Sequence, residues 1–164
     1  MMKTLLLMRH AKSSWSDSSL SDHERPLNNR GINAAGKMGK LISDLDLIPE
    51  IILSSSSKRT KETIRYFLDS CPFSGEVIYT RNLYHGGPEE FLESLRQWGE
   101  GFLRVMIVGH NPGMEYALEE FTGERERMVT ASIAQIEFES ESWHSLLDDP
   151  SGDLVNFWRP REVG

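Results

Sequence analysis

The residues of this sequence that could do chemistry are two histidines and two arginines, each placed after a short apolar segment. Guanidinium groups match the oxygens of a phosphate in shape and charge. One imidazole can attack phosphorus, and a second can donate to an oxygen as charge builds in the transition state. Such a set supplies the positioning and charge neutralisation that phosphoryl transfer needs, without a metal. The set consists of Arg9 and His10 after residues 5–8, Arg59 after residues 51–57, and His110 after residues 105–109.

The elements that must position these side chains alternate along the chain. Continuous apolar runs are typical of strands buried on both faces of a sheet, and apolar residues three and four apart predict helices. Strands are predicted at residues 4–8, 51–53, 76–79, 105–108, 131–138 and 154–158, and helices at 30–45, 58–68, 88–98 and 114–121. This alternation predicts an α/β fold with a mostly parallel sheet.

In such a sheet the carboxyl ends of the strands meet at one edge, where ligands bind. The four candidate residues all follow predicted strands, so we expect them to converge there. A helix that begins beside Arg59 would add backbone donors and the positive end of its dipole. The polar stretch from Ser13 to Asn29 predicts a long loop at the same edge.

Length and composition narrow the class of protein. The chain has 164 residues, of which 38% are hydrophobic, as expected for one globular domain over residues 1–164. Its net charge of −7 argues against a nucleic-acid partner. No apolar run is long enough to span a membrane, and the first run is too short for a signal peptide, so we expect a cytoplasmic protein. A single cysteine, Cys71, allows neither an internal disulfide nor a multi-cysteine metal site.

Four short segments, in order between Leu5 and Glu115, resemble the histidine phosphatase superfamily and most closely its SixA-type phosphohistidine phosphatases. The segments are MRHAKSSW, DHERPLNNRG, SSSSKRTKET and VGHNPGME. The resemblance implies a three-layer α/β/α fold of the phosphoglycerate mutase-like type. It also implies that His10 is the nucleophile, that it passes through a phosphohistidine intermediate, and that a backbone carbonyl orients its ring.

The same resemblance assigns the neighbouring residues. It implies that Arg9, Arg59 and His110 surround the phosphoryl group, with no cofactor and no metal. Arg25 matches a further arginine of the branch, which either contacts the phosphate or braces the loop. Ser13 is a further candidate for substrate binding.

The sequence departs from larger members of the superfamily where they carry a general acid. The stretch after the third predicted strand, residues 82–87, contains no carboxylate. Asp17, Asp22 and Glu24 in the first loop are alternative candidates, whereas Glu89 and Glu90 fit the first turn of a helix. An alcohol leaves poorly without a proton donor, but a phosphorylated imidazole leaves easily. The short chain also lacks room for a large lid, so an open site would admit a protruding protein side chain.

The favoured interpretation is a phosphatase that hydrolyses phosphohistidine on a protein. Two alternatives stay open, namely a phosphatase of small phosphomonoesters from the same superfamily and a module that binds a phosphoprotein without turning it over. We also expect hydrolysis to fall at acid pH as His10 is protonated, with a pKa near ~6.5. His85 is expected near the rim of the site as a bystander, and Trp15 either contacts a partner protein or pins the first loop.

Overall fold

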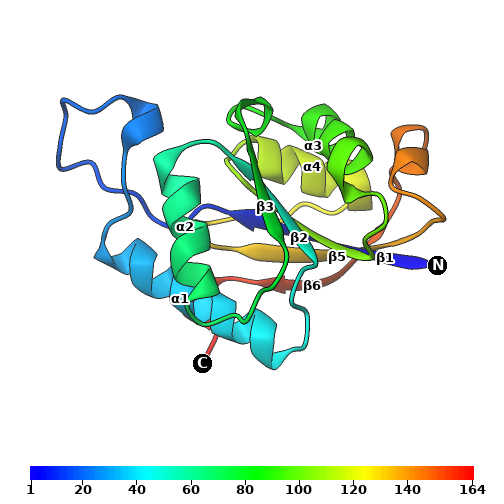
Figure 1. Ribbon diagram of the computed structural model, residues 1–164, viewed down its shortest axis with the longest axis horizontal. Helices are drawn as coiled ribbons and strands as arrows, with labels where there is room; N and C mark the ends of the chain where they lie inside the picture. The colour runs from blue at the N-terminus through cyan, green and yellow to red at the C-terminus, as the bar shows by residue number, and fades with distance from the viewer.

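A six-stranded sheet forms the centre of the computed structural model, which describes residues 1–164 (Figure 1). Its strand order is β3-β2-β4-β1-β5-β6. The strands are β1 (Met2–Arg9), β2 (Ile51–Ser55), β3 (Glu76–Thr80), β4 (Arg104–Gly109), β5 (Ile133–Glu139) and β6 (Asp153–Trp158). Strands β3, β2, β4 and β1 are parallel, β5 is antiparallel to β1, and β6 is antiparallel to β5. The prediction of a mostly parallel sheet is confirmed.

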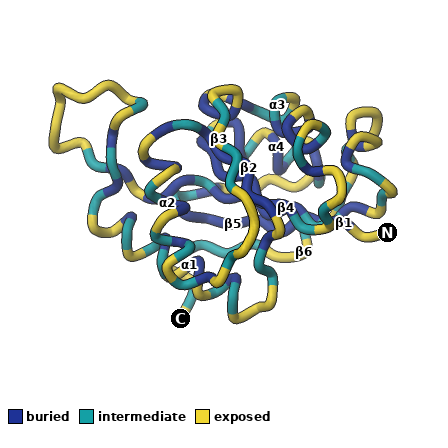
Figure 2. Tube along the Cα trace, in the orientation of Figure 1, coloured by how far each residue is buried: buried dark blue, intermediate teal, exposed yellow.

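Helices cover both faces of this sheet. The helices are α1 (Asn29–Asp44), α2 (Lys58–Leu68), α3 (Pro88–Ser94) and α4 (Gly113–Thr122). Alternate residues of β1 point to opposite faces, so Leu6 and Met8 pack with α1 and α2, and Leu5 and Leu7 pack with α3 and α4. The inner strands β1, β2, β4 and β5 are buried between them, whereas the edge strands β3 and β6 are partly exposed (Figure 2). The predicted three-layer α/β/α architecture is therefore confirmed. None of these helices combines the length and the apolar character needed to traverse a lipid bilayer.

Side-chain caps fix where the helices beside the site begin. The Asn28 side chain accepts from the backbone N–H of Gly31 at the start of α1, and Ser57 caps α2 by accepting from Thr60. Because only two residues separate the end of β2 from the start of α2, Arg59 lies in the first helical turn, at the carboxyl edge of the sheet.

Two regions differ in detail from the sequence prediction. The helix expected over residues 88–98 is α-helical only as far as Ser94 and continues as a π-helical turn over Leu95–Gly99. The loop after β1 contains a short 3-10 turn, Asp22–Glu24, and its two stems are joined by a bridge between Ser13 and Leu27. The loop projects at the upper left of Figure 1. The bridge holds its two stems together at the edge of the sheet.

Candidate active site

His10 follows β1 directly and is buried, with only 7% of its surface exposed. Its Nδ1 lies 2.7 Å from the backbone oxygen of Ala11. A carbonyl only accepts, so Nδ1 carries the proton and donates it. The neutral ring therefore has its lone pair on Nε2. This is the orientation by a backbone carbonyl that the family resemblance implies.

The second histidine, His110, follows β4, and its ring centroid lies 5.1 Å from that of His10. Its Nδ1 is 3.3 Å from Nη2 of Arg59, and its Nε2 is 2.8 Å from the hydroxyl of Ser55. A guanidinium only donates, so Nδ1 accepts and the proton of the neutral ring lies on Nε2. The two imidazoles, 100 positions apart in the printed sequence, thus lie side by side at the sheet edge.

Burial determines the charge of both rings. Removal from water, together with the neighbouring guanidinium groups, lowers the pKa of His10 to about 3, although the hydrogen bond to Ala11 opposes the shift. Removal from water, with the adjacent His10 and Arg59, lowers the pKa of His110 to about 2. The expectation of a value near ~6.5 for His10 was wrong, because the sequence does not show how completely the ring is buried. Both imidazoles are neutral at pH 7.

Asp22 joins the arginines of the site to each other. Its Oδ2 accepts from Nη2 of Arg59 at 2.9 Å and from the Tyr84 hydroxyl at 2.5 Å, and its Oδ1 accepts from Nη1 of Arg25 at 3.0 Å. The Asp22 backbone oxygen accepts from Nη1 of Arg59 at 2.7 Å. The Tyr84 hydroxyl and the paired guanidinium of Arg59 hold the pKa of Asp22 far below its usual range. These contacts stabilise the ionised carboxylate and argue against Asp22 as a general acid.

Arg25 braces the loop, which is one of the two roles left open for it. Its guanidinium donates to the Ser13 hydroxyl and, at 3.1 Å, to the Ser14 backbone oxygen, which braces the loop. It also lines the cavity that contains His10. The ring of Trp15, which is 77% exposed, lies over it, with 3.0 Å between the guanidinium carbon and the ring centroid.

Arg9 leaves a donor without a partner. Its Nη1 donates to the backbone oxygen of Met128 at 2.9 Å, while its buried Nε has no hydrogen-bond partner. An unpaired buried donor on a cation costs free energy. An anion placed here would meet a positively charged group.

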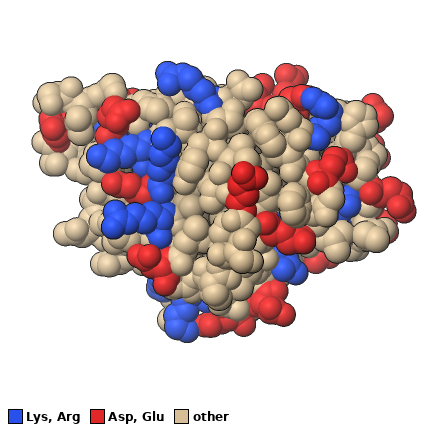
Figure 3. All heavy atoms as spheres, viewed as in Figure 1, with Lys and Arg blue, Asp and Glu red and all other residues tan.

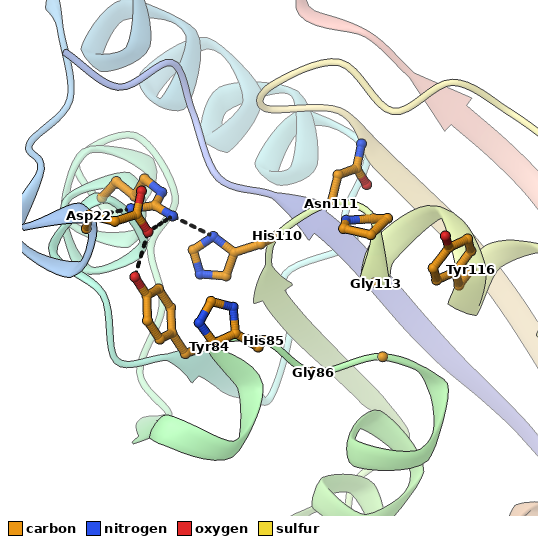
Figure 4. A pocket seen from close by; sticks show the side chains of 11 residues that line it. Asp22, Tyr84, His85, Gly86, His110, Asn111, Gly113 and Tyr116 are labelled. Carbon is orange, nitrogen blue, oxygen red and sulfur yellow. Dashed lines mark hydrogen bonds and ion pairs between the residues drawn. The ribbon is translucent and has the colours of Figure 1, made fainter. Parts of the chain in front are cut away.

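Two adjoining cavities open at this edge of the sheet. The first, here named the His10 cavity, has a volume of about 360 Å³, and all six residues singled out in the sequence line it. The second, the Tyr84 cavity, has a volume of about 420 Å³ (Figure 4). The residues common to the walls of both cavities are Asp22, Arg59, His110 and Asn111. Figure 4 shows the rings of Tyr84, His85 and His110 close together, with the Tyr84 hydroxyl pointing to Asp22.

Sequence reasoning missed several residues of these walls. Lys12 and Thr130 line the His10 cavity, and Tyr84 and Tyr116 line its neighbour. Lys12 lies two residues after the nucleophile candidate, which was a usable signal. Thr130 comes from the loop before β5, and nothing in its local sequence marks it.

The remaining acid candidates stay away from both cavities. Asp17 bonds Ser19 within the loop, and Glu24 lies beside His23. Glu90 accepts from the backbone N–H of Gly87 at the start of α3, as its predicted place in a first helical turn implies. Asp22 is therefore the one carboxylate in either wall. No three side chains of His, Cys, Asp or Glu lie close enough together to hold a metal ion.

The positive charge of the site is local. Arg9, Arg25 and Arg59 gather around two neutral histidines in a chain whose net charge is −7. On the face drawn in Figure 3, basic side chains also form separate groups between acidic side chains. One of these basic groups lies over α2. A phosphate would be attracted to this edge by the arginines and not by the charge of the whole protein.

Residues 5–84 match the family model described as "Histidine phosphatase superfamily (branch 1)". An uncharacterized chloroplastic protein of Arabidopsis thaliana is 31% identical over 161 residues, which cover 92% of this chain and 74% of that protein. A protein of Agrobacterium tumefaciens, provisionally named phosphohistidine phosphatase SixA, has a structure that superimposes with a TM-score of 0.82 at 27% identity, over 96% of this chain and 98% of that one. The chain belongs to the histidine phosphatase superfamily.

Within this superfamily, two further structures share the fold of the chain. A protein of Nakamurella multipartitia with the same provisional name matches with a TM-score of 0.84 at 24% identity, over 98% of this chain and 97% of that one. The protein histidine phosphatase SixA complexed with tungstate matches with a TM-score of 0.79 at 20% identity, over 98% and 99%. The chain is thus a phosphatase-type hydrolase with the SixA-like, phosphoglycerate mutase-like fold.

Proposed function

We propose that this phosphatase hydrolyses phosphohistidine on a protein through a covalent intermediate on His10. The observation that carries the proposal is the hydrogen bond from Nδ1 of His10 to the Ala11 oxygen at 2.7 Å. It leaves Nε2 with a lone pair, in a ring that burial keeps neutral. A neutral imidazole is a nucleophile, whereas an imidazolium is not.

In the first step Nε2 of His10 attacks phosphorus. A bond forms between phosphorus and Nε2, and the bond from phosphorus to the substrate nitrogen breaks, with its electron pair returning to that nitrogen. Arg9, Arg25 and Arg59 lie around the cavity to neutralise the phosphoryl oxygens.

In the second step water attacks the phosphorylated His10. A new bond forms between the water oxygen and phosphorus, and the electron pair of the bond between phosphorus and nitrogen returns to Nε2. One proton of the water stays on its oxygen and the other passes to a phosphoryl oxygen, so that inorganic phosphate leaves as dihydrogen phosphate. Because Nδ1 keeps its proton throughout, bonded to the Ala11 oxygen, His10 returns to its starting form.

The proposed preference for phosphohistidine is based on the absence of a protonated carboxyl group from the two cavities. Asp22 is the one carboxylate in the two cavities, and its ion pairs keep it from carrying a proton at neutral pH. Alkyl phosphates then lose the general-acid assistance that contributes about 10²- to 10⁴-fold to rates. An imidazole whose other nitrogen is protonated departs as a neutral molecule and needs no such donor.

The test is a comparison of kcat/KM on three substrates of different leaving group. A protein phosphorylated chemically on histidine is compared with p-nitrophenyl phosphate and with an alkyl phosphate. We expect phosphohistidine to be the best substrate and the alkyl phosphate the poorest. An alkyl phosphate turned over as fast as phosphohistidine would refute the proposed specificity.

The covalent step has a test of its own. Rapid acid-free quenching with ³²P-labelled substrate should trap label on the wild-type chain. His10→Ala should trap none and should retain less than about a thousandth of the activity, because the nucleophile is gone. Full activity in His10→Ala would contradict the mechanism, and binding without turnover in the wild type would indicate a phosphoprotein-binding module.

A further inference from the structure

We propose that Asp22 selects the substrate by accepting a hydrogen bond from the protonated, non-phosphorylated nitrogen of the phosphohistidine ring. The inference rests on the proposed function and adds the residue that recognises the leaving group. It starts from an unusual placement, since a carboxylate in a phosphate site repels the phosphate. A carboxylate there is useful where the substrate also brings a positive charge.

Asp22 stands where the two cavities meet. It is part of the wall of the His10 cavity and of the Tyr84 cavity. A phosphoryl group beside His10 would place its leaving group on the far side of phosphorus, because nucleophile and leaving group are in line in this chemistry. The Tyr84 cavity, lined by the rings of Tyr84 and His85, is the adjoining space for that ring.

The carboxylate has room for one more donor. Oδ2 accepts from Arg59 and Tyr84, but Oδ1 accepts from Arg25 alone. An ionised carboxylate has about four acceptor positions. The Asp22 side chain is 50% exposed although its partners Arg25 and Arg59 are buried. Asp22 therefore keeps unused acceptor capacity on a side chain that is half exposed.

The chemistry explains why such a contact would help. A phosphorylated imidazole with a proton on its second nitrogen is a cation, and loss of phosphorus leaves neutral imidazole. Without that proton, the departing ring is an imidazolide anion and leaves slowly. A carboxylate beside the second nitrogen stabilises the protonated form and raises the pKa of the ring. Asp22 would thus keep the substrate in its reactive state at a pH where the free ring loses the proton.

The enzyme's own intermediate has the same arrangement. Phosphorylated His10 keeps its proton on Nδ1, held by the Ala11 oxygen at 2.7 Å. The phosphoryl group then passes between two imidazoles. Each ring carries a proton on the nitrogen that does not bond phosphorus, and an oxygen accepts a hydrogen bond from that N–H. The donor ring would be held by Asp22 and the acceptor ring by Ala11.

Other charged and titratable groups face the same place and must be considered in a pH experiment. Around Asp22 these are Arg25 from its own loop, Arg59 from α2, Tyr84 and His85 from the segment after β3, and His110 after β4. His110 stays neutral because burial lowers its pKa to about 2. The experiment must separate the protonation of the substrate from that of these groups.

The test compares Asp22→Asn with wild type on two small substrates. Phosphoimidazole can gain or lose the second proton, whereas 1-methyl-3-phosphoimidazolium is permanently cationic. We divide the kcat of Asp22→Asn by the kcat of wild type at each pH. On phosphoimidazole we expect this ratio to fall about tenfold between pH 6 and pH 8. On the methylated substrate, with spontaneous hydrolysis subtracted, the ratio should stay the same at both pH values.

Simple displacement of the arginines would give a different result, because it would lower kcat equally on both substrates at both pH values. That outcome, or an unchanged ratio on phosphoimidazole, overturns the role of Asp22. Asp17→Asn, which removes an exposed carboxylate from the same loop, is the matched control and should behave as wild type. Asp22→Ser serves as a second variant if Asp22→Asn does not fold.

The proposed function and this inference fail in distinguishable ways. A wild-type enzyme that hydrolyses p-nitrophenyl phosphate but neither phosphoimidazole nor phosphohistidine refutes the proposed substrate and the role of Asp22 together. Wild-type turnover of phosphoimidazole with a pH-independent ratio in Asp22→Asn refutes only the role of Asp22.

Discussion

Burial lowers the pKa of the His10 imidazole to about 3, so the ring should stay neutral well into the acid range. We expect its Nε2 to keep the ¹⁵N chemical shift of an unprotonated nitrogen at pH 5, while Nδ1 shows a bonded proton. An ¹⁵N-labelled histidine spectrum, assigned with His10→Ala, measures both. A His10 resonance that titrates near pH ~6.5 would contradict the burial described above.

The reactive residues were predictable from the sequence, but their connections were not. An apolar strand precedes each of Arg9, His10, Arg59 and His110. Because the carboxyl ends of parallel strands share one edge of a sheet, the sequence predicts that these side chains lie together. Asp22 has no such marker. It reaches the site because its loop turns back, and a contact that depends on loop conformation has no periodic signal.

At the scale of elements, the start of α1 packs directly on the chain that carries the catalytic loop. A Cβ added at Gly31 would lie 2.1 Å from the Lys12 backbone oxygen, whereas one at Gly36 would meet nothing closer than 3.8 Å. We therefore expect Gly31→Ala to lower the free energy of unfolding by about 1–3 kcal/mol and to reduce kcat/KM, because Lys12 lies next to the loop stem.

Gly36→Ala in the same helix is the matched control. It should raise the free energy of unfolding by about 0.5–1 kcal/mol, since alanine favours a helix interior over glycine and the added Cβ makes only an ordinary van der Waals contact. Urea unfolding curves of both variants give the comparison. Equal stability changes at the two positions would show that α1 and Lys12 are not in close contact.

Element positions were the most predictable part of the fold. The helix expected at residues 58–68 is α2, and each strand lies where an apolar run was found. These segments have strong periodicity and clear caps, so local sequence and tertiary structure agree. The π-helical turn over Leu95–Gly99 was not predictable, because its apolar spacing is the same as that of the α-helix before it.

For the whole molecule, the two buried histidines predict a loss of stability in mild acid. Their pKa values are lowered in the folded state, so the unfolded chain binds more protons below pH ~6.5 and stability falls as the pH falls. For His10 the loss should be on the order of 2 kcal/mol between pH 7 and pH 5.

The measurement is the free energy of unfolding in urea at the two pH values. The double variant His10→Gln, His110→Gln should lose markedly less between pH 7 and pH 5 than wild type does, whatever its stability at pH 7. An identical loss in both proteins would mean that the rings are not buried in neutral form.

The strand order also governs when the chain can fold during synthesis. Strand β1 pairs only with β4 and β5, whose residues follow their β1 partners by 100 positions or more. Its apolar residues therefore leave the ribosome long before their partners exist. We expect newly made β1 to depend on chaperones until residue 139 has emerged, and nascent chains stalled before β5 to be digested rapidly by protease.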